Sequence, residues 1–266
     1  MTYCLGIITQ EGLVMASDSR TNAGYDQVNV CRKMYTFVEP GNRILVMMTS
    51  GSLSLTQSVV ALLRRDFEVG RGLANAPTLY DACRVVGENI RRVAELDRAA
   101  LERDEYKFNI HVLLGGQIKG EPPGLHLIYP QGNPLSASED SPFLQIGECK
   151  YGRPILDRGI KYQQTSLEEA AKYALISIDS TMRSNVTVGP PIDMLLYRAD
   201  EFDITQRRRL TSKDPDLIDV HARWEQALRK AVQELPSIRF NHEEQNNIGG
   251  TMSSDFVIER EALDPT

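Results

Sequence analysis

The first 24 residues, MTYCLGIITQEGLVMASDSRTNAG (residues 1–24), decide the fold. Two apolar runs, residues 2–8 and 13–17, flank a turn at residues 10–12 and predict an antiparallel β-hairpin at the very start of the chain. Hairpin pairing places Asp18, at the end of the second run, level with the first residues of the first strand. The chain start and an acidic side chain are therefore expected side by side.

The composition excludes several classes of protein. The chain has 266 residues and a formal net charge of −6, which disfavours a nucleic-acid-binding body. No apolar run reaches membrane-spanning length, and no basic segment with an apolar core, as in a signal peptide, begins the chain. The cysteines lie far apart and the histidines lack metal-ligand spacing, so we expect reduced thiols, a cytoplasmic location and no metal or cofactor.

The order of the predicted elements indicates the fold class. A block of strands precedes two helices, and a second block of strands precedes further helices. This order favours an α+β fold, specifically a four-layer αββα sandwich of two antiparallel sheets, because a parallel fold would alternate strands with single helices. Strands are predicted at 33–37, 43–49, 108–114, 124–129, 143–146 and 192–197, and helices at 55–67, from 78, at 166–182 and from 214 or 216 to 232.

The chain divides into one large domain and a short polar extension. Residues 1–235 are predicted to form the domain, and residues 236–266 to form an extension that contacts other subunits. The last predicted helix carries an apolar stripe with Trp224 between Leu217 and Leu235, which we interpret as intramolecular core. The basic run at 207–209 indicates a solvated strand end, or a salt bridge to a neighbouring subunit as the less favoured reading.

Thr2 is the candidate nucleophile. We expect Met1 to be removed because the residue after it is small, although its position alone favours Thr2 as an ordinary second residue. A terminal threonine carries a hydroxyl and an α-amine whose pKa is about 7.7–8.0, so it can supply its own base. Lys33, held by Asp18, would favour the alkoxide, and a backbone N–H in the break at residues 50–52 would stabilise an oxyanion.

These pieces resemble a known family. Thr2, GLVMASDSRTNAG (12–24), RKM (32–34) and TSGSLSLTQ (49–57) are similar to the β-subunits of the proteasome, and the opening is most similar to the bacterial Anbu (ancestral β-subunit) peptidases. The resemblance implies an N-terminal nucleophile hydrolase in which Asp18, Lys33 and Gly51 are the aspartate, lysine and oxyanion-hole glycine. It also implies a ring-like homo-oligomer that acts on peptides or unfolded proteins.

The same resemblance marks supporting positions and departures. Glu148 stands where the family has a serine near the nucleophile. Ser184 and Thr187 stand at the aspartate and the later serine of a second motif, so Thr187 can still supply a hydroxyl but Ser184 cannot supply a charge. The resemblance further implies that Met48, near the end of its strand, lines the specificity pocket. Cys149 has no histidine beside it and is interpreted as a buried thiol.

Three functions remain open on the sequence. The leading hypothesis is an N-terminal threonine endopeptidase that works through an acyl-enzyme. A proteolytically silent ring scaffold or binding subunit would explain the departures at Glu148 and Ser184, but it has no need of Thr2, Asp18 and Lys33 together. An amidohydrolase of small amides is the third.

Overall fold

Two five-stranded antiparallel sheets form the body of the protein in the computed structural model, which describes residues 2–22, 28–103, 105 and 108–239. The predicted removal of Met1 and most of the predicted extension therefore lie outside the described residues. The first sheet has the order β10 (Phe143–Gly147), β1 (Tyr3–Thr9), β2 (Gly12–Asp18), β11 (Ile192–Arg198), β12 (Gln206–Leu210). The second has the order β5 (Met34–Glu39), β6 (Arg43–Gly51), β7 (Ile110–Ile118), β8 (Gly124–Ile128), β9 (Pro134–Ser136).

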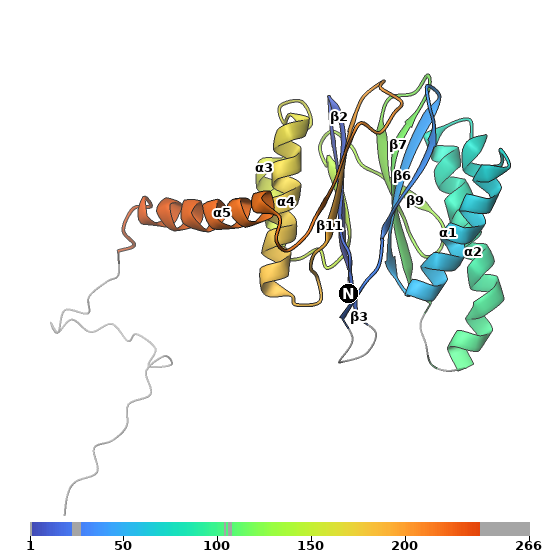
Figure 1. Cartoon of the computed structure of the whole chain (residues 1–266), viewed down its shortest axis with the longest axis horizontal. Coiled ribbons are helices and arrows are strands. Elements are labelled where there is room, and N and C mark those ends of the chain that lie inside the picture. The colour runs from blue at the N-terminus through green and yellow to red at the C-terminus, as the bar shows by residue number, and fades with distance from the viewer. Residues whose placement is uncertain (1, 23–27, 104, 106–107, 240–266) are drawn as a thin grey trace, which may run out of the picture.

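Helices cover the outer faces of the two sheets (Figure 1). Helices α1 (Leu53–Glu68) and α2 (Leu79–Arg103) lie against the second sheet, and α3 (Arg153–Gly159) and α4 (Leu167–Ser184) lie against the first. The predicted α+β class with antiparallel sheets is confirmed. The remaining described elements are the ribbon β3 (Arg20–Asn22) and β4 (Val28–Val30), a 3₁₀ turn (Gly72–Ala74) and α5 (Pro215–Gln233).

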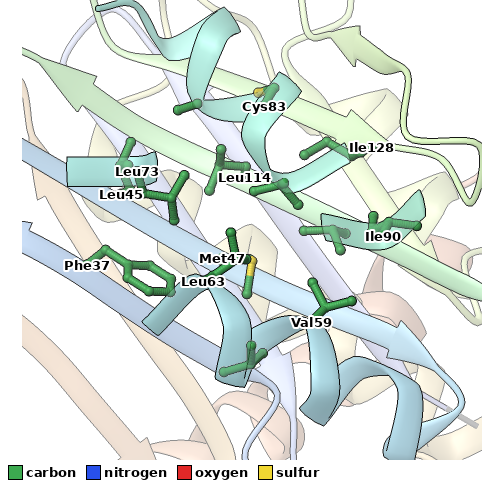
Figure 2. Close-up of a cluster of buried hydrophobic side chains, with 14 of the residues drawn as sticks. Phe37, Leu45, Met47, Val59, Leu63, Leu73, Cys83, Ile90, Leu114 and Ile128 are labelled. Carbon is green, nitrogen blue, oxygen red and sulfur yellow. The ribbon is translucent and has the colours of Figure 1, made fainter. Parts of the chain in front are cut away.

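Three apolar clusters hold these elements together. One lies between the second sheet and α1 and α2, where Leu45 and Met47 meet Val59 and Leu63 (Figure 2). Another lies between the first sheet and α3 and α4, and the third fills the space between the two sheets. Because β1 and β2 are covered on both faces, all seven residues of each are buried, which explains why apolar residues dominate both strands and do not alternate with polar ones.

The predicted N-terminal hairpin is confirmed, with β1 beginning at Tyr3 rather than Thr2. Cys4 pairs with Ser17 and Thr9 pairs with Gly12, so the turn occupies residues 10–11. Gly12 has φ +144°, and a Cβ there would lie 2.1 Å from the carbonyl oxygen of Tyr197, which favours glycine at this position. This register brings the start of β1 beside the end of β2.

The interpretation of the last helix as intramolecular core is wrong. Helix α5 begins against α4 and then projects away from the body (Figure 1). Leu217 is its one buried residue, whereas Ile218, Leu228 and Val232 are 55%, 47% and 66% exposed. The short helix α3, which the sequence analysis missed, packs against α4 and helps to cover the first sheet. No helix in the described part of the chain has the length and apolar character needed to cross a membrane.

His126 is a buried titratable residue in the core beneath α2. It pairs with Leu114 across β7 and β8 and is 8% exposed, and its Nδ1 has no hydrogen-bond partner among the described residues. Burial lowers the pKa of the His126 imidazole because the charged form loses its hydration.

We expect the free energy of unfolding to fall as the pH drops below about 6.5, the ordinary histidine pKa, since the unfolded chain then binds a proton that buried His126 resists. One such group contributes a slope of at most about 1.4 kcal/mol per pH unit. Urea unfolding at pH 7.5 and 5.5 should show a smaller difference for His126→Leu than for the wild type. Equal differences would contradict this account.

Candidate active site

The backbone on both sides of Thr2 is fixed by hydrogen bonds. The Glu148 N–H donates to the carbonyl oxygen of Thr2 (2.8 Å), and the Tyr3 N–H donates to Oδ1 of Asp18 (2.9 Å). Gly147, at the end of β10, has φ +86°, and a Cβ there would lie 1.9 Å from the Thr2 carbonyl oxygen. Thr2 is therefore held between the ends of β2 and β10.

A buried ion pair lies beneath this end of β1. Lys33 Nζ is 2.6 Å from Oδ1 of Asp18, and the two residues are 5% and 0% exposed. Lys33 also donates to the carbonyl oxygen of Arg20 (2.6 Å), while Oδ2 of Asp18 accepts hydrogen bonds from the N–H groups of Arg20 and Gly189. Because Asp18 ends β2 and Lys33 immediately precedes β5, the pair joins the two sheets.

The electrostatics of the pair follow from its burial. Desolvation raises the pKa of the Asp18 carboxyl, and the positive charge of Lys33 with the N–H groups of Tyr3 and Gly189 opposes that rise. Each charged group thus lost its hydration on folding, and the attraction of the opposite charge compensates that loss. A lysine fixed in this way presents a positive charge next to the start of β1.

The turn after β6 faces the same region. Gly51 has φ +113°, and a Cβ there would lie 2.0 Å from the carbonyl oxygen of Asn109, so glycine is required for the close approach of β6 and β7. The N–H of Ser52 donates to that oxygen (3.1 Å), and α1 begins at Leu53. The N-terminus of a helix carries a partial positive charge, which suits a developing oxyanion.

Thr2 and Gly51 line one open cavity of about 850 Å³. None of its lining residues carries an acidic or a basic side chain other than the histidine His111. The lining consists of Thr2, Thr21, residues 50–54, Asn109, His111, Leu127, Tyr129, residues 145–147 and Cys149. In the described part of the chain, no cluster of three or more His, Cys, Asp or Glu side chains could hold a metal ion.

The structure does not place Met48 at the cavity. Met48 is fully buried between the two sheets, among residues such as Cys4 and Met34. Ser50, two residues further along β6, lines the cavity instead. Residues two apart in a strand point to the same side, so Met48 faces the right way but lies too deep in the core to be pocket wall.

Glu148 and Thr187 are joined by a residue that the sequence analysis missed. Asn185 Nδ2 donates to Oε2 of Glu148 (2.8 Å), and its Oδ1 accepts hydrogen bonds from the Thr187 hydroxyl (2.6 Å) and N–H (3.0 Å). Ser184, the last residue of α4, is exposed and makes none of these contacts. The signal in the sequence that could have identified Asn185 was its chemistry, because its side-chain amide can donate and accept hydrogen bonds at the same time.

Cys149 also lines the cavity, and its thiol is a weak candidate for the nucleophile. Burial, and then the nearby charge of Glu148, raises the pKa of the Cys149 thiol. A thiol with a raised pKa is protonated at neutral pH and reacts slowly. Of the two, the hydroxyl of Thr2 is therefore the better candidate.

Comparison with known proteins places these features in context. No family model matches the chain. It is 25% identical over 205 residues to the proteasome subunit beta of Haloquadratum walsbyi, covering 77% of this chain and 76% of that one. The structure of Anbu (ancestral beta-subunit) from Yersinia bercovieri is 42% identical with a TM-score of 0.85, covering 91% of this chain and all of that one. The helical assembly of the Anbu complex from Pseudomonas aeruginosa is 44% identical with a TM-score of 0.85, covering 90% and 98%.

Removal of one partner of the ion pair should destabilise the protein strongly. Lys33→Met leaves Asp18 buried without its counter-charge, and we expect a loss of about 3–5 kcal/mol in the free energy of unfolding, measured with urea. Arg32→Met is the matched control, because Arg32 is exposed and its loss should cost less than about 0.5 kcal/mol. Equal losses for the two variants would show that the pair does not support the fold.

Proposed function

Because the chain belongs to the Anbu family of proteasome-type β-subunits, we propose that it is an N-terminal threonine endopeptidase with the αββα sandwich of N-terminal nucleophile hydrolases. The observation that carries the proposal is the position of Thr2. It lies at a cavity that the Gly51 turn also lines, directly before the strand that the Lys33–Asp18 pair supports.

The proposed reaction uses these groups in sequence. After removal of Met1, the free amine of Thr2 accepts the hydroxyl proton through a water molecule, and Thr2 Oγ attacks the peptide carbonyl. The positive charge of Lys33, held by Asp18, stabilises the alkoxide, and the Gly51 N–H stabilises the tetrahedral oxyanion. The C–N bond then breaks, the proton passes to the leaving amine, and water hydrolyses the resulting ester to restore Thr2.

Glu148, Asn185 and Thr187 are proposed to support the nucleophile indirectly. The Glu148 N–H already holds the Thr2 carbonyl, and the Asn185 amide fixes the Glu148 side chain. The chain of hydrogen bonds thus replaces the serine and aspartate of the related β-subunits with a carboxylate tied to an amide. Ser184 lies outside this network, and we assign it no part in it.

We further propose that the protein assembles with copies of itself and acts on peptides or unfolded proteins in the cytoplasm. The support is the apolar surface of α5, since Leu228 and Val232 are exposed one helical turn apart on a helix that stands away from the body. A helical assembly is known for the Anbu complex of Pseudomonas aeruginosa. Coverage of α5 by a second copy would remove this apolar surface from water.

A silent scaffold is the alternative that the departures at Glu148 and Ser184 favour. A scaffold would keep the layers, the ion pair that supports them and the exposed α5 surface, but it would not need the hydroxyl of Thr2 at the cavity. A hydrolase of small amides shares the proposed site and differs only in the size of its substrate.

A threonine-directed electrophile tests the proposed nucleophile. A peptide epoxyketone with an uncharged side chain should form one adduct with the wild type, and intact-mass measurement should find that the labelled protein lacks Met1. Thr2→Ala should form no adduct because the attacking hydroxyl is gone.

Cys149→Ser is the matched control for this experiment, because Cys149 lines the same cavity and carries the other candidate nucleophile. It should be labelled like the wild type. Labelling that survives Thr2→Ala, or that occurs on protein retaining Met1, would rule out the mechanism. A protein that none of several electrophiles labels would be a scaffold.

Introduction of negative charge on the apolar surface tests the role of α5 in self-association. The double variant Leu228→Glu, Val232→Glu should weaken self-association by at least about 100-fold, since each carboxylate would lose hydration at the interface. Gln226→Glu, Gln233→Glu adds the same charge on other parts of α5 and should associate like the wild type. Light scattering over a concentration series measures both, and identical masses would exclude α5 as the interface.

A further inference from the structure

The cavity beside Thr2 extends into a compartment between the two sheets. We call it the far wing and define it by five lining residues, His111, Leu127, Tyr129, Gln145 and Ile146. Strand β10 of the first sheet packs over β7 and β8 of the second at this place. Because β7 and β8 lie on the side of β6 that faces away from β5, the far wing lies away from the strand that Lys33 precedes.

The far wing continues the apolar core between the sheets. His111 and Leu113 are two residues apart in β7 and share one face, and Leu113 belongs to the inter-sheet core. Leu127 and Ile146 belong to or pack against the same core. The ring of His111 therefore lies where that core opens toward Thr2, with an apolar floor beneath it.

Two rings form one wall of the far wing. The centroids of His111 and Tyr129 are 6.4 Å apart with an interplanar angle of 72°, which is an edge-to-face contact. Both side chains are half-buried, so part of each ring still faces the cavity. Such a wall offers aromatic surface and dispersion contacts to a side chain that enters.

The far wing has no fixed charge. Burial lowers the pKa of the His111 imidazole, which keeps it neutral at neutral pH. The amide N–H of Gln145 already donates to the hydroxyl of Tyr3, behind the cavity wall. A charged side chain in this compartment would lose hydration without gaining a partner, which is costly.

We propose that the far wing is a side-chain subsite for a peptide residue next to the bond that Thr2 attacks, and that it selects an uncharged aromatic or aliphatic side chain. Lysine, arginine, aspartate and glutamate are rejected because nothing in the wing compensates their charge. Naming the scissile bond rests on the proposed function, but the binding preference does not require cleavage.

Binding to Thr2→Ala protein tests the preference without catalysis. Calorimetry would compare acetylated pentapeptide amides of four alanines around a central phenylalanine, leucine, lysine or glutamate. The phenylalanine and leucine peptides should bind at least about 10-fold more tightly than the charged ones. Equal affinities across the four peptides would overturn the proposal.

Variants that place a charge in the far wing test whether this compartment sets the preference among the four peptides. In the same background, His111→Asp should raise the affinity for the lysine peptide relative to the phenylalanine peptide by at least about 10-fold, whereas the matched neutral variant His111→Gln should keep the original order. Leu127→Lys, at a second position in the wing, should favour the glutamate peptide. If His111→Asp does not fold, as judged by circular dichroism, Leu127→Lys alone decides. If the folded charged variants bind the four peptides in the same order of affinity as the parent protein, the peptides bind elsewhere.

The two proposals fail separately. If Thr2→Ala protein prefers the phenylalanine and leucine peptides but no electrophile labels the wild type, the peptidase proposal is refuted and the subsite proposal stands. Labelling at Thr2 without any preference among the four peptides would refute the subsite and leave the peptidase.

Discussion

The ion pair between Lys33 and Asp18 is the interaction on which the rest of the structure depends. Asp18 ends a strand of the first sheet and Lys33 immediately precedes a strand of the second. Both groups are almost completely removed from water, so each is stable only while the other stays in place. Asp18 also accepts the N–H of Tyr3 and so fixes the start of β1. One buried contact thereby sets the distance between the sheets at this end and the position of Thr2.

The layered packing explains why the cavity lies where it does. The start of β1 and the ends of β2 and β10 meet at one edge of the first sheet because their registers are antiparallel. The end of β6 lies at the corresponding edge of the second sheet, and the apolar core between the sheets opens between them. Gly51 and Gly147 fit this edge because a Cβ at either position would collide with the neighbouring backbone. The cavity is thus the uncovered end of a core.

The departures at Glu148 and Ser184 change the side chains near Thr2 but leave the hydrogen bonds that fix its backbone in place. Glu148 keeps its backbone contact with Thr2 whatever its side chain, and Asn185 holds that side chain through a neutral amide. The carboxylate is therefore buried and hydrogen-bonded beside the cavity, and it is not part of the cavity lining. On the outer side of α4, helix α5 makes one contact with α4, including the hydrogen bond between His221 and Asp179 (2.9 Å), and leaves the rest of its surface open.

The sequence by itself determined the N-terminal hairpin, the α+β class and most strands and helices, because their signals are local. Apolar runs, the turn before Gly12, and the caps at Thr78–Asp81 and Ser166–Glu169 depend on neighbours within a few residues. It also indicated that Asp18 lies beside the chain start, because hairpin register follows from the turn. Only the tertiary structure decided that α5 is exposed, that Ser50 rather than Met48 lines the cavity, and that Asn185 rather than Ser184 holds Glu148. Periodicity shows which face of an element is apolar, but what covers that face, and how deeply, depends on segments far away in the chain.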